Sequence, residues 1–197
     1  VGMAQTTRQM ESEILAYKYM TEQFTASGNT KAVEELREYN VLQSDSCVTS
    51  FYKSMARDKY MHELGVGTMR GMNSVFSDIF IPVWTCRAYT LREKYNIWVS
   101  KFSFIRKTNL INELLTTDFT EKVTKLEIPV YFFGGKYDMT VNTDLSKAYL
   151  EKLQAPVKGF YTFNESAHSP IYEEPQRVRE ILVKDVLNHT TNLADKK

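Results

Sequence analysis

The sequence predicts an α/β protein in which a helical region is followed by a short strand–helix–strand–helix unit with parallel strands. Three observations lead to this prediction. Residues 7–125 show mostly helical apolar spacing and few strand-like runs. Residues 128–133 form a continuous apolar run, which is typical of a parallel strand buried on both faces. A second strand-like run at 157–163 follows after one helix, at the spacing of a right-handed crossover.

The composition is that of a globular chain and argues against several classes of function. Of the 197 residues, 43% are hydrophobic, so a sizeable core can form. The 25 basic and 24 acidic residues nearly cancel, which removes the electrostatic argument for binding nucleic acid or an anionic membrane. No uncharged apolar run is long enough to cross a bilayer, and no signal peptide opens the sequence. Cys47 and Cys86 have neither CxxC nor metal-finger spacing, so we expect no disulfide framework and a reducing, cytoplasmic location.

The first residues have the composition of a short apolar strand. Residues 1–6 begin with Val-Gly-Met-Ala-Gln and have no initiator methionine. We expect them to be the remnant of a core strand from a longer chain. The expected organisation is therefore a strand remnant at 1–6, a helical region at 7–125 and a sheet unit at 126–197.

Apolar spacing and cap residues predict the helices of the helical region. Gly28 stands where a C-terminal cap belongs, and Thr30 is expected to cap the helix that follows. Thr90 and Glu93 have the spacing of a capping box. The helices expected here are Thr7–Ala26, Thr30–Tyr39, Ser46–Leu64, Leu91 to about Ile105, and a short one near Leu110–Leu115.

A glycine-rich loop and two apolar stretches lie between these helices. Gly65, Gly67 and Gly71 interrupt the helical pattern. Residues 76–84 are apolar and are expected to be irregular or a short helix. An aromatic stripe farther along is expected to be core of the helical region, with the lining of an acyl or aminoacyl pocket as the alternative. The stripe consists of Tyr89, Tyr95, Trp98, Phe102 and Phe104.

Strand and helix signals also predict the elements of the sheet unit. The apolar run at 128–133 ends in two glycines, and a helix is expected at Thr143–Leu153. The second strand is expected at Val157–Phe163, as a parallel neighbour of the first. Pro175 stands in the first turn of a final helix that reaches about Leu187.

Two loops of this unit contain residues that suit acid–base chemistry. Asp138 ends the sequence Gly-Gly-Lys-Tyr-Asp after the first strand, and His168 lies in Asn-Glu-Ser-Ala-His-Ser-Pro after the second. Both loops follow the carboxyl ends of adjacent parallel strands, where open α/β sheets place their sites. A carboxylate there can hold the imidazole tautomer while the histidine deprotonates a nucleophile. We therefore predict that the two side chains lie within hydrogen-bond reach, or within one water of it.

The two strands and their loops resemble a known family. The sequences IPVYFFGGKYD at 128–138 and FYTFNESAHSPIYEEP at 160–175 are similar to the end of α/β-hydrolases of the proline-iminopeptidase-like branch. The resemblance implies that Asp138 is the acid and His168 the histidine of a catalytic triad. It also implies that residues 7–125 are the cap that this family inserts between strands. Residues 126–197 would then be the C-terminal part of the hydrolase core.

The family's nucleophile motif, G-x-S-x-G, is missing from this sequence. The only two glycines spaced four apart, Gly67 and Gly71, enclose Met69 instead of serine. The oxyanion-hole loop, which comes earlier in the family, is missing as well. The resemblance thus implies part of a serine-type hydrolase acting on an ester, amide or peptide bond, with no cofactor or metal. Haloalkane dehalogenases and epoxide hydrolases share the fold with an aspartate nucleophile, and only the missing motif would separate them.

Each candidate residue also has a structural interpretation. An aspartate in a strand-to-helix loop is commonly an N-cap or turn former, and a lone loop histidine is commonly structural. The joint position of Asp138 and His168 on consecutive strand ends favours the triad pair. Ser166, close to the histidine, lacks the strained turn of a nucleophile and is set aside.

The remaining titratable candidates are assigned structural roles. His62 lies on a predicted helix and is expected to be a surface or core histidine. His189 lies in a C-terminal turn and is assigned no role. Glu173 and Glu174 are expected to cap or charge the start of the final helix.

Two classes of function stay open at this point. The first is an enzyme whose intact form acts on a small molecule or a short peptide. The second is a non-catalytic interaction module, in which the helices and a bare sheet edge bind a partner or a second copy. An upstream G-x-S-x-G would favour the enzyme. We also expect self-association to a homo-oligomer, because Val130–Phe133 would expose an apolar edge without further strands. The fold does not determine the substrate.

Overall fold

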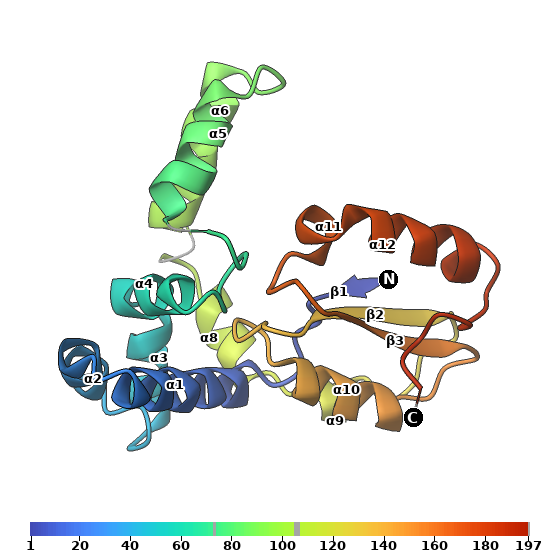
Figure 1. Cartoon of the computed structure of the whole chain (residues 1–197), viewed down its shortest axis with the longest axis horizontal. Coiled ribbons are helices and arrows are strands. Elements are labelled where there is room, and N and C mark those ends of the chain that lie inside the picture. The colour runs from blue at the N-terminus through green and yellow to red at the C-terminus, as the bar shows by residue number, and fades with distance from the viewer. Residues whose placement is uncertain (73, 105–106, 197) are drawn as a thin grey trace.

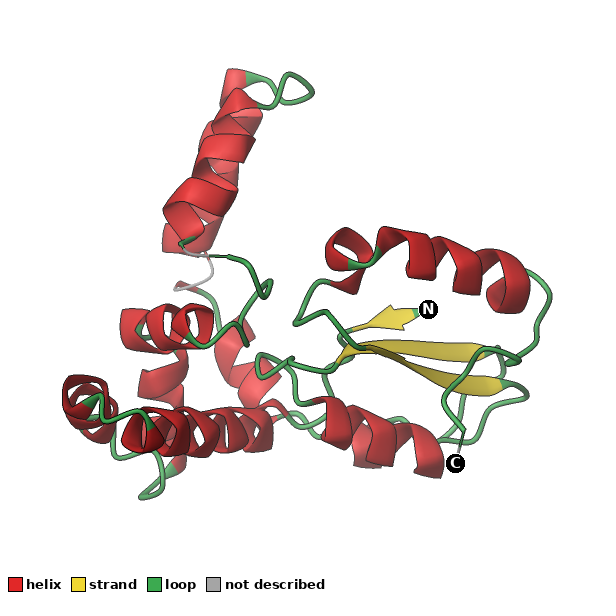
Figure 2. Cartoon of the chain, in the orientation of Figure 1, coloured by secondary structure: helices red, strands yellow, loops and turns green. Residues whose placement is uncertain are grey.

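The structure of the chain is a computed structural model, which describes residues 1–72, 74–104 and 107–196. Within these residues the strands form a single three-stranded sheet with helices on both faces (Figures 1 and 2). The other helices lie beside this unit, and the segment with α5 and α6 projects from the molecule as an arm (Figure 1). The arrangement confirms the predicted α/β class.

The sheet is parallel, and its strand order is β1–β2–β3. The strands are β1 (Gly2–Met3), β2 (Val130–Gly135) and β3 (Lys158–Phe163). Val130 of β2 lies opposite Lys158 of β3, and Phe132 lies opposite Gly2 of β1. The prediction of two adjacent parallel strands is thus confirmed, and the first residues of the chain do form a strand.

Each face of the sheet has its own core because successive side chains of a strand point to opposite faces. Val130 and Phe132 pack against helix α10 (Thr143–Lys152) on one face. Tyr131 and Phe133 pack with the apolar side chains of helix α12 on the other. The helices that follow β3 are α11 (Pro170–Glu173), α12 (Pro175–Ile181) and the π-helical turn η3 (Leu182–Val186).

Strand β2 is the central strand, contrary to the expectation that it exposes an unpaired edge. All six of its residues are buried between β1 and β3 and the helices of both faces. The outer edge of β3 is partly covered by the C-terminal residues. Asp195 donates its backbone N–H to the Phe160 carbonyl at 2.8 Å and accepts from the Thr162 N–H at 3.1 Å. The exposed strand edge therefore no longer argues for self-association, which stays a prediction.

The helical region packs around its own apolar core, which includes Met20, Leu36 and Phe51. The helices of its body are α1 (Gln9–Ala26), α2 (Thr30–Arg37), α3 (Asp45–Tyr52), α4 (Met55–Glu63), α8 (Leu110–Thr116) and α9 (Phe119–Lys122). The single helix predicted at Ser46–Leu64 is wrong, because Ser54 adopts an extended backbone and caps α4. The cap of α2 is Asn29 and not Thr30, since the Asn29 side chain accepts from a backbone N–H of the first turn.

The arm contains the helical stretches η1 (Phe76–Phe80), α5 (Ile81–Thr85), α6 (Leu91–Val99) and η2 (Ser100–Phe104). The apolar stretch at 76–84 is therefore helical. The capping box is confirmed, because Thr90 and Glu93 bond each other's backbone N–H groups. The two sides of the arm meet where the rings of Phe80 and Trp98 lie 4.9 Å apart.

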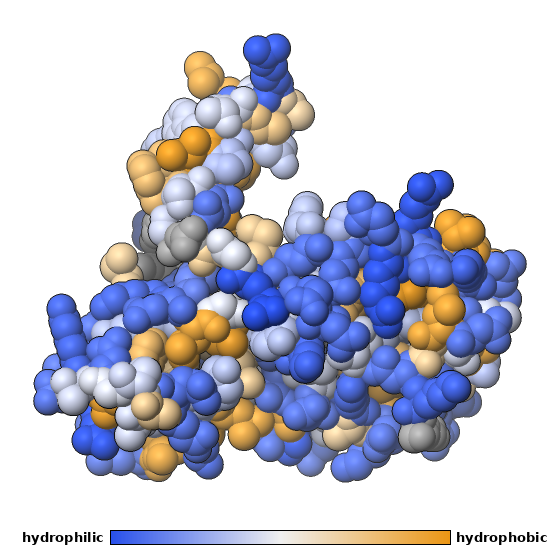
Figure 3. Space-filling model, viewed as in Figure 1, coloured by the Kyte–Doolittle hydropathy of each residue, from blue (hydrophilic) through white to orange (hydrophobic). Residues whose placement is uncertain are grey.

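Much of the apolar surface of the arm faces solvent (Figure 3). Tyr89 and Tyr95 are exposed, so the interpretation of the aromatic stripe as core is wrong for these two residues. The side chains of Phe102 and Phe104 lie outside the described residues, as does Ile105, the expected end of this helix. Across the described residues, no helix combines the length and the apolar character needed to cross a membrane.

A buried carboxylate ties the C-terminal residues to the sheet. Asp185 of η3 is fully buried. It accepts hydrogen bonds from the Tyr161 hydroxyl at 2.9 Å and from the backbone N–H groups of Asn192 and Leu193 at 3.0 and 2.8 Å. Burial raises the pKa of Asp185, but the hydrogen bonds to its carboxylate together lower the pKa by more than burial raises it. The pKa of Asp185 therefore lies below the ordinary value.

Replacing Asp185 with asparagine is expected to destabilise the fold at neutral pH and to weaken its acid dependence. A pKa that folding depresses contributes stability above the unfolded pKa, and this stability is lost as pH falls through the folded pKa. The variant should lose about 1–3 kcal/mol of unfolding free energy near neutral pH, and less in acid. Urea unfolding at both pH values measures the difference. An equal loss in acid and at neutral pH would contradict the role of the charge.

Candidate active site

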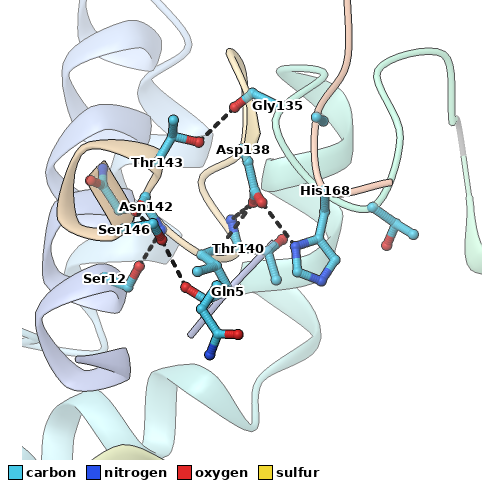
Figure 4. Close-up of polar contacts among 12 residues, drawn as sticks. Gln5, Ser12, Gly135, Asp138, Thr140, Asn142, Thr143, Ser146 and His168 are labelled. Atoms are coloured by element: carbon cyan, nitrogen blue, oxygen red, sulfur yellow. Dashed lines mark hydrogen bonds and ion pairs between the residues drawn. The ribbon is translucent and has the colours of Figure 1, made fainter. Parts of the chain in front are cut away.

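The acid loop, residues 136–142 between β2 and α10, places Asp138 just beyond the carboxyl end of β2 and fixes its carboxylate (Figure 4). The residue is buried, with 2% of its surface exposed. Oδ1 accepts hydrogen bonds from the backbone N–H groups of Thr140 and Val141, both at 2.9 Å. Oδ2 lies 3.0 Å from Nδ1 of His168. The two backbone bonds therefore hold one oxygen and leave the other for the imidazole ring.

His168 lies in the histidine loop, residues 164–169 between β3 and α11, and turns one ring nitrogen toward the acid (Figure 4). Its side chain is 31% exposed, and no described residue hydrogen-bonds the opposite nitrogen, Nε2. An ionised carboxylate only accepts hydrogen bonds, so it favours the tautomer with the proton on Nδ1 and the lone pair on Nε2. Such a ring can take a proton from a hydroxyl and return it to a leaving group. The predicted hydrogen-bond reach between the two side chains is confirmed.

The two loops meet because their strands are neighbours in the sheet. Tyr137 donates its backbone N–H to the Ser166 carbonyl at 3.1 Å. The closest approach is at Gly135, where a Cβ atom would lie 1.8 Å from the carbonyl oxygen of Ala167. Glycine is therefore required at this position so that the acid loop and the histidine loop can come together.

Glu173 and Glu174 bind the histidine loop instead of capping the final helix. Glu173 accepts a hydrogen bond from the Ala167 N–H at 2.9 Å. Glu174 accepts from the Glu165 N–H at 2.9 Å and from the Ser166 hydroxyl at 2.7 Å. Glu174 occupies the N-cap position of α12 but makes no side-chain cap there. The expected capping role is therefore wrong, because the loop's backbone donors need acceptors and these carboxylates supply them. The alternative, that they place negative charge at the start of the final helix, stays a prediction.

The other residues singled out in the sequence are occupied elsewhere. Ser166 is fully buried and donates its hydroxyl to Glu174, so it is not available as a nucleophile. His62 is a core histidine whose Nε2 lies 3.2 Å from the Thr68 hydroxyl. His189 stands in an exposed turn with a φ of +55°.

Helix α1 also contacts the acid loop, which helical spacing did not predict. Gln9 donates its side-chain amide to the Thr140 carbonyl at 2.8 Å. Ser12 accepts from the backbone N–H of Asn142 (Figure 4). Both α1 residues are buried polar groups, and they share the buried face of the helix with Glu13 and with apolar side chains. Polar residues among the apolar positions of this helix are the signal in the sequence that could have indicated such contacts.

The site is an acid–histidine pair in which Nε2 of His168 has no hydrogen-bond partner among the described residues. In the part of the chain that the structure describes, no group of three or more His, Cys, Asp or Glu side chains could hold a metal ion. A pair of this geometry at neighbouring strand ends is what enzymes of acyl transfer use to activate a hydroxyl nucleophile. The structure thus combines an α/β fold with an acid–histidine pair beyond the carboxyl ends of two neighbouring parallel strands.

Comparison with known proteins finds one partial relative. The chain is similar to a protein named "Probable aminopeptidase YbaC" from Bacillus subtilis (strain 168), with 34% identity over 83 residues. The aligned part covers 42% of this chain and 26% of that protein, so the match spans about a quarter of the relative's length. No family model matches the chain, and no solved structure matches it. The similarity indicates a hydrolase-like relation.

Proposed function

We propose that this chain supplies the acid and the histidine of a serine-type α/β-hydrolase that cleaves an ester, amide or peptide bond. The observation that supports the proposal best is the 3.0 Å contact between Asp138 Oδ2 and His168 Nδ1, with Nε2 open. The similarity to a probable aminopeptidase makes an aminoacyl or short-peptide substrate the first class to test. In this proposal residues 7–125 are the cap, and residues 126–197 belong to the hydrolase core.

The proposed reaction uses His168 first as a base and then as an acid. Nε2 takes the proton of a serine hydroxyl while the serine oxygen attacks the substrate carbonyl carbon. Asp138 stabilises the imidazolium that forms, and the imidazolium then protonates the leaving amine or alcohol. The same nitrogen then deprotonates a water that attacks the acyl carbon, and it returns this proton to the serine oxygen as the acid product leaves. We propose that this serine lies in a G-x-S-x-G turn outside the 197 residues, since the motif is missing from them.

Labelling with a serine-directed fluorophosphonate tests the proposal. A full-length protein with an upstream G-x-S-x-G should label stoichiometrically on that serine and lose the label when His168 is replaced by alanine. The 197-residue chain alone should neither label nor hydrolyse an ester at an enzymatic rate, because the pair activates a nucleophile without replacing it. A stoichiometric adduct on a serine of this chain would show that its own serines are not inert.

A non-catalytic interaction module is the second candidate function. The projecting arm supports it, because Phe76, Leu91 and Tyr95 are each more than half exposed, at 63%, 74% and 63%. A full-length protein without an upstream serine motif and without labelling would favour this candidate. Self-association and a cytoplasmic location stay predictions under both.

A further inference from the structure

A short loop of the helical region contacts the acid loop and the histidine loop at the same time. This loop, residues 65–70, follows helix α4. The Val66 carbonyl accepts the backbone N–H of Met139, next to Asp138, at 3.1 Å. The neighbouring Gly67 carbonyl accepts the backbone N–H of His168 at 3.3 Å. Two consecutive carbonyls therefore bind the two loops that hold the pair.

The shape of this loop is set by the end of α4. Gly65 has a φ of +66°, and its N–H donates to the His62 carbonyl at 3.0 Å. The Val66 N–H donates to the Met61 carbonyl at 2.9 Å. This pair of bonds is a Schellman motif, in which a left-handed glycine reverses the chain after a helix. Val66 and Met61 are both buried in the core of the helical region, so the loop begins from a fixed point.

The His62 side chain packs against the backbone of residues 65–70. A Cβ atom added to Gly67 would lie 2.6 Å from Cδ2 of the His62 ring, so ring and backbone are in direct contact. Thr68 donates its backbone N–H to His62 Nε2 at 3.3 Å. Burial lowers the pKa of His62, which favours the neutral ring that this acceptor role requires.

The far end of the loop is also attached to the histidine loop. Arg70 donates its backbone N–H to Glu173 at 2.6 Å, and the same carboxylate binds the Ala167 N–H. The Arg70 guanidinium lies 3.6 Å from the centre of the Tyr137 ring in the acid loop. Contacts at both ends of residues 65–70 thus connect α4 with the two strand-end loops.

We propose that His62 and Gly67 are positioning residues for the Asp138–His168 pair. Contact with the His62 ring fixes the position of the backbone at Gly67. The hydrogen bonds of the Val66 and Gly67 carbonyls then fix the position of the acid loop relative to the histidine loop. The proposal rests on the proposed function only for the pair's catalytic use, since the geometry itself can be tested without catalysis.

Substitution in the glycine-rich loop tests this proposal with a matched control. Gly67→Ala places a methyl group against the His62 ring, whereas Gly71→Ala meets no atom within 4 Å. We expect Gly67→Ala to speed amide hydrogen exchange of Met139 and His168 by about tenfold, because their acceptors move. The imidazole Nδ1–H proton resonance of His168 should also shift or broaden. Gly71→Ala should leave both readouts unchanged.

Two further variants keep the test decisive if Gly67→Ala fails to fold. His62→Ala removes the support without adding bulk and should also speed exchange of these two amides while the thermal midpoint shows a folded chain. The double variant His62→Ala/Gly67→Ala should recover part of the protection lost in Gly67→Ala. The proposal would be overturned if amide exchange at Met139 and His168 were unchanged in His62→Ala. It would also be overturned if the unmodified chain showed no Nδ1–H resonance for His168. Neither readout depends on serine labelling, so its failure is distinct from failure of the proposed function.

Discussion

Replacing His168 with alanine in the full-length protein is expected to lower the hydrolytic kcat by about 10⁴-fold or more. The variant loses the only group of the pair that can move a proton between the nucleophile and the leaving group. Asp138→Asn should cause a loss of about 10⁴-fold with the shape of the site preserved, because an amide can donate to Nδ1 and stabilise the wrong tautomer. Steady-state kinetics on aminoacyl and ester chromogenic substrates measure both effects.

A second histidine provides the control for these variants. His189 is exposed and has a φ of +55°, a conformation that asparagine tolerates. His189→Asn should therefore retain full activity and stability. A loss of less than about tenfold for His168→Ala would contradict a general-base role, since general acid–base catalysis alone is worth about 10²-fold or more.

Breaking the buried ion pair of the helical region is expected to have the largest effect on stability. The Arg57 guanidinium contacts both oxygens of Glu13 at 2.6 Å, and the two side chains are only 7% and 0% exposed. Arg57→Met should lower the unfolding free energy by about 3–5 kcal/mol, because it leaves an uncompensated carboxylate in the core. Urea unfolding followed by circular dichroism measures the change.

The double variant separates the charge effect from lost packing. Glu13→Leu/Arg57→Met removes both charges, so it should recover most of the stability that Arg57→Met loses. The exposed pair Glu180–Lys184 serves as a surface control, and Glu180→Ala should show no measurable change in the urea midpoint. A double variant no more stable than Arg57→Met would show that packing and not charge dominates at this position.

The ion pair also bears on the candidate site because of what it contacts. Gln9 donates to Glu13 and to the Thr140 carbonyl, which is two residues beyond Asp138. Arg57 lies on α4, the helix that ends in the loop at 65–70. The core of the helical region and the acid–histidine pair are therefore connected through α1 and α4. We expect variants of the pair's surroundings to be sensitive to changes in this core.

Local pattern was enough to predict the strand–helix–strand–helix unit and the two candidate residues within it. A continuous apolar run, a glycine pair and a second apolar run placed β2 and β3, because backbone periodicity and turn chemistry act over a few residues. Consecutive parallel strands end at the same edge of a sheet, so the direction of the two strands is enough to predict that Asp138 and His168 meet.

Local sequence pattern could not predict the contacts between segments that are distant in the chain. The apolar face at Ser46–Leu64 looks like one helix, but Ser54 is extended and its side chain caps α4. The aromatic stripe looks like core, yet Tyr89 and Tyr95 are exposed on the arm. Glu173 and Glu174 have the spacing of helix-start residues, but the nearby loop presents unpaired N–H groups that bind them.

The sequence by itself therefore determined the α/β class, the two parallel strands and the acid and histidine at their ends. Each of these depends on side-chain periodicity or on chain direction, which are properties of short segments. Only the tertiary structure decided that β2 is central, that α1 supports the acid loop and that residues 65–70 join the two loops. These features arise from burial and hydrogen bonding between segments far apart in the chain, where the available partner is determined by packing and not by neighbours in sequence.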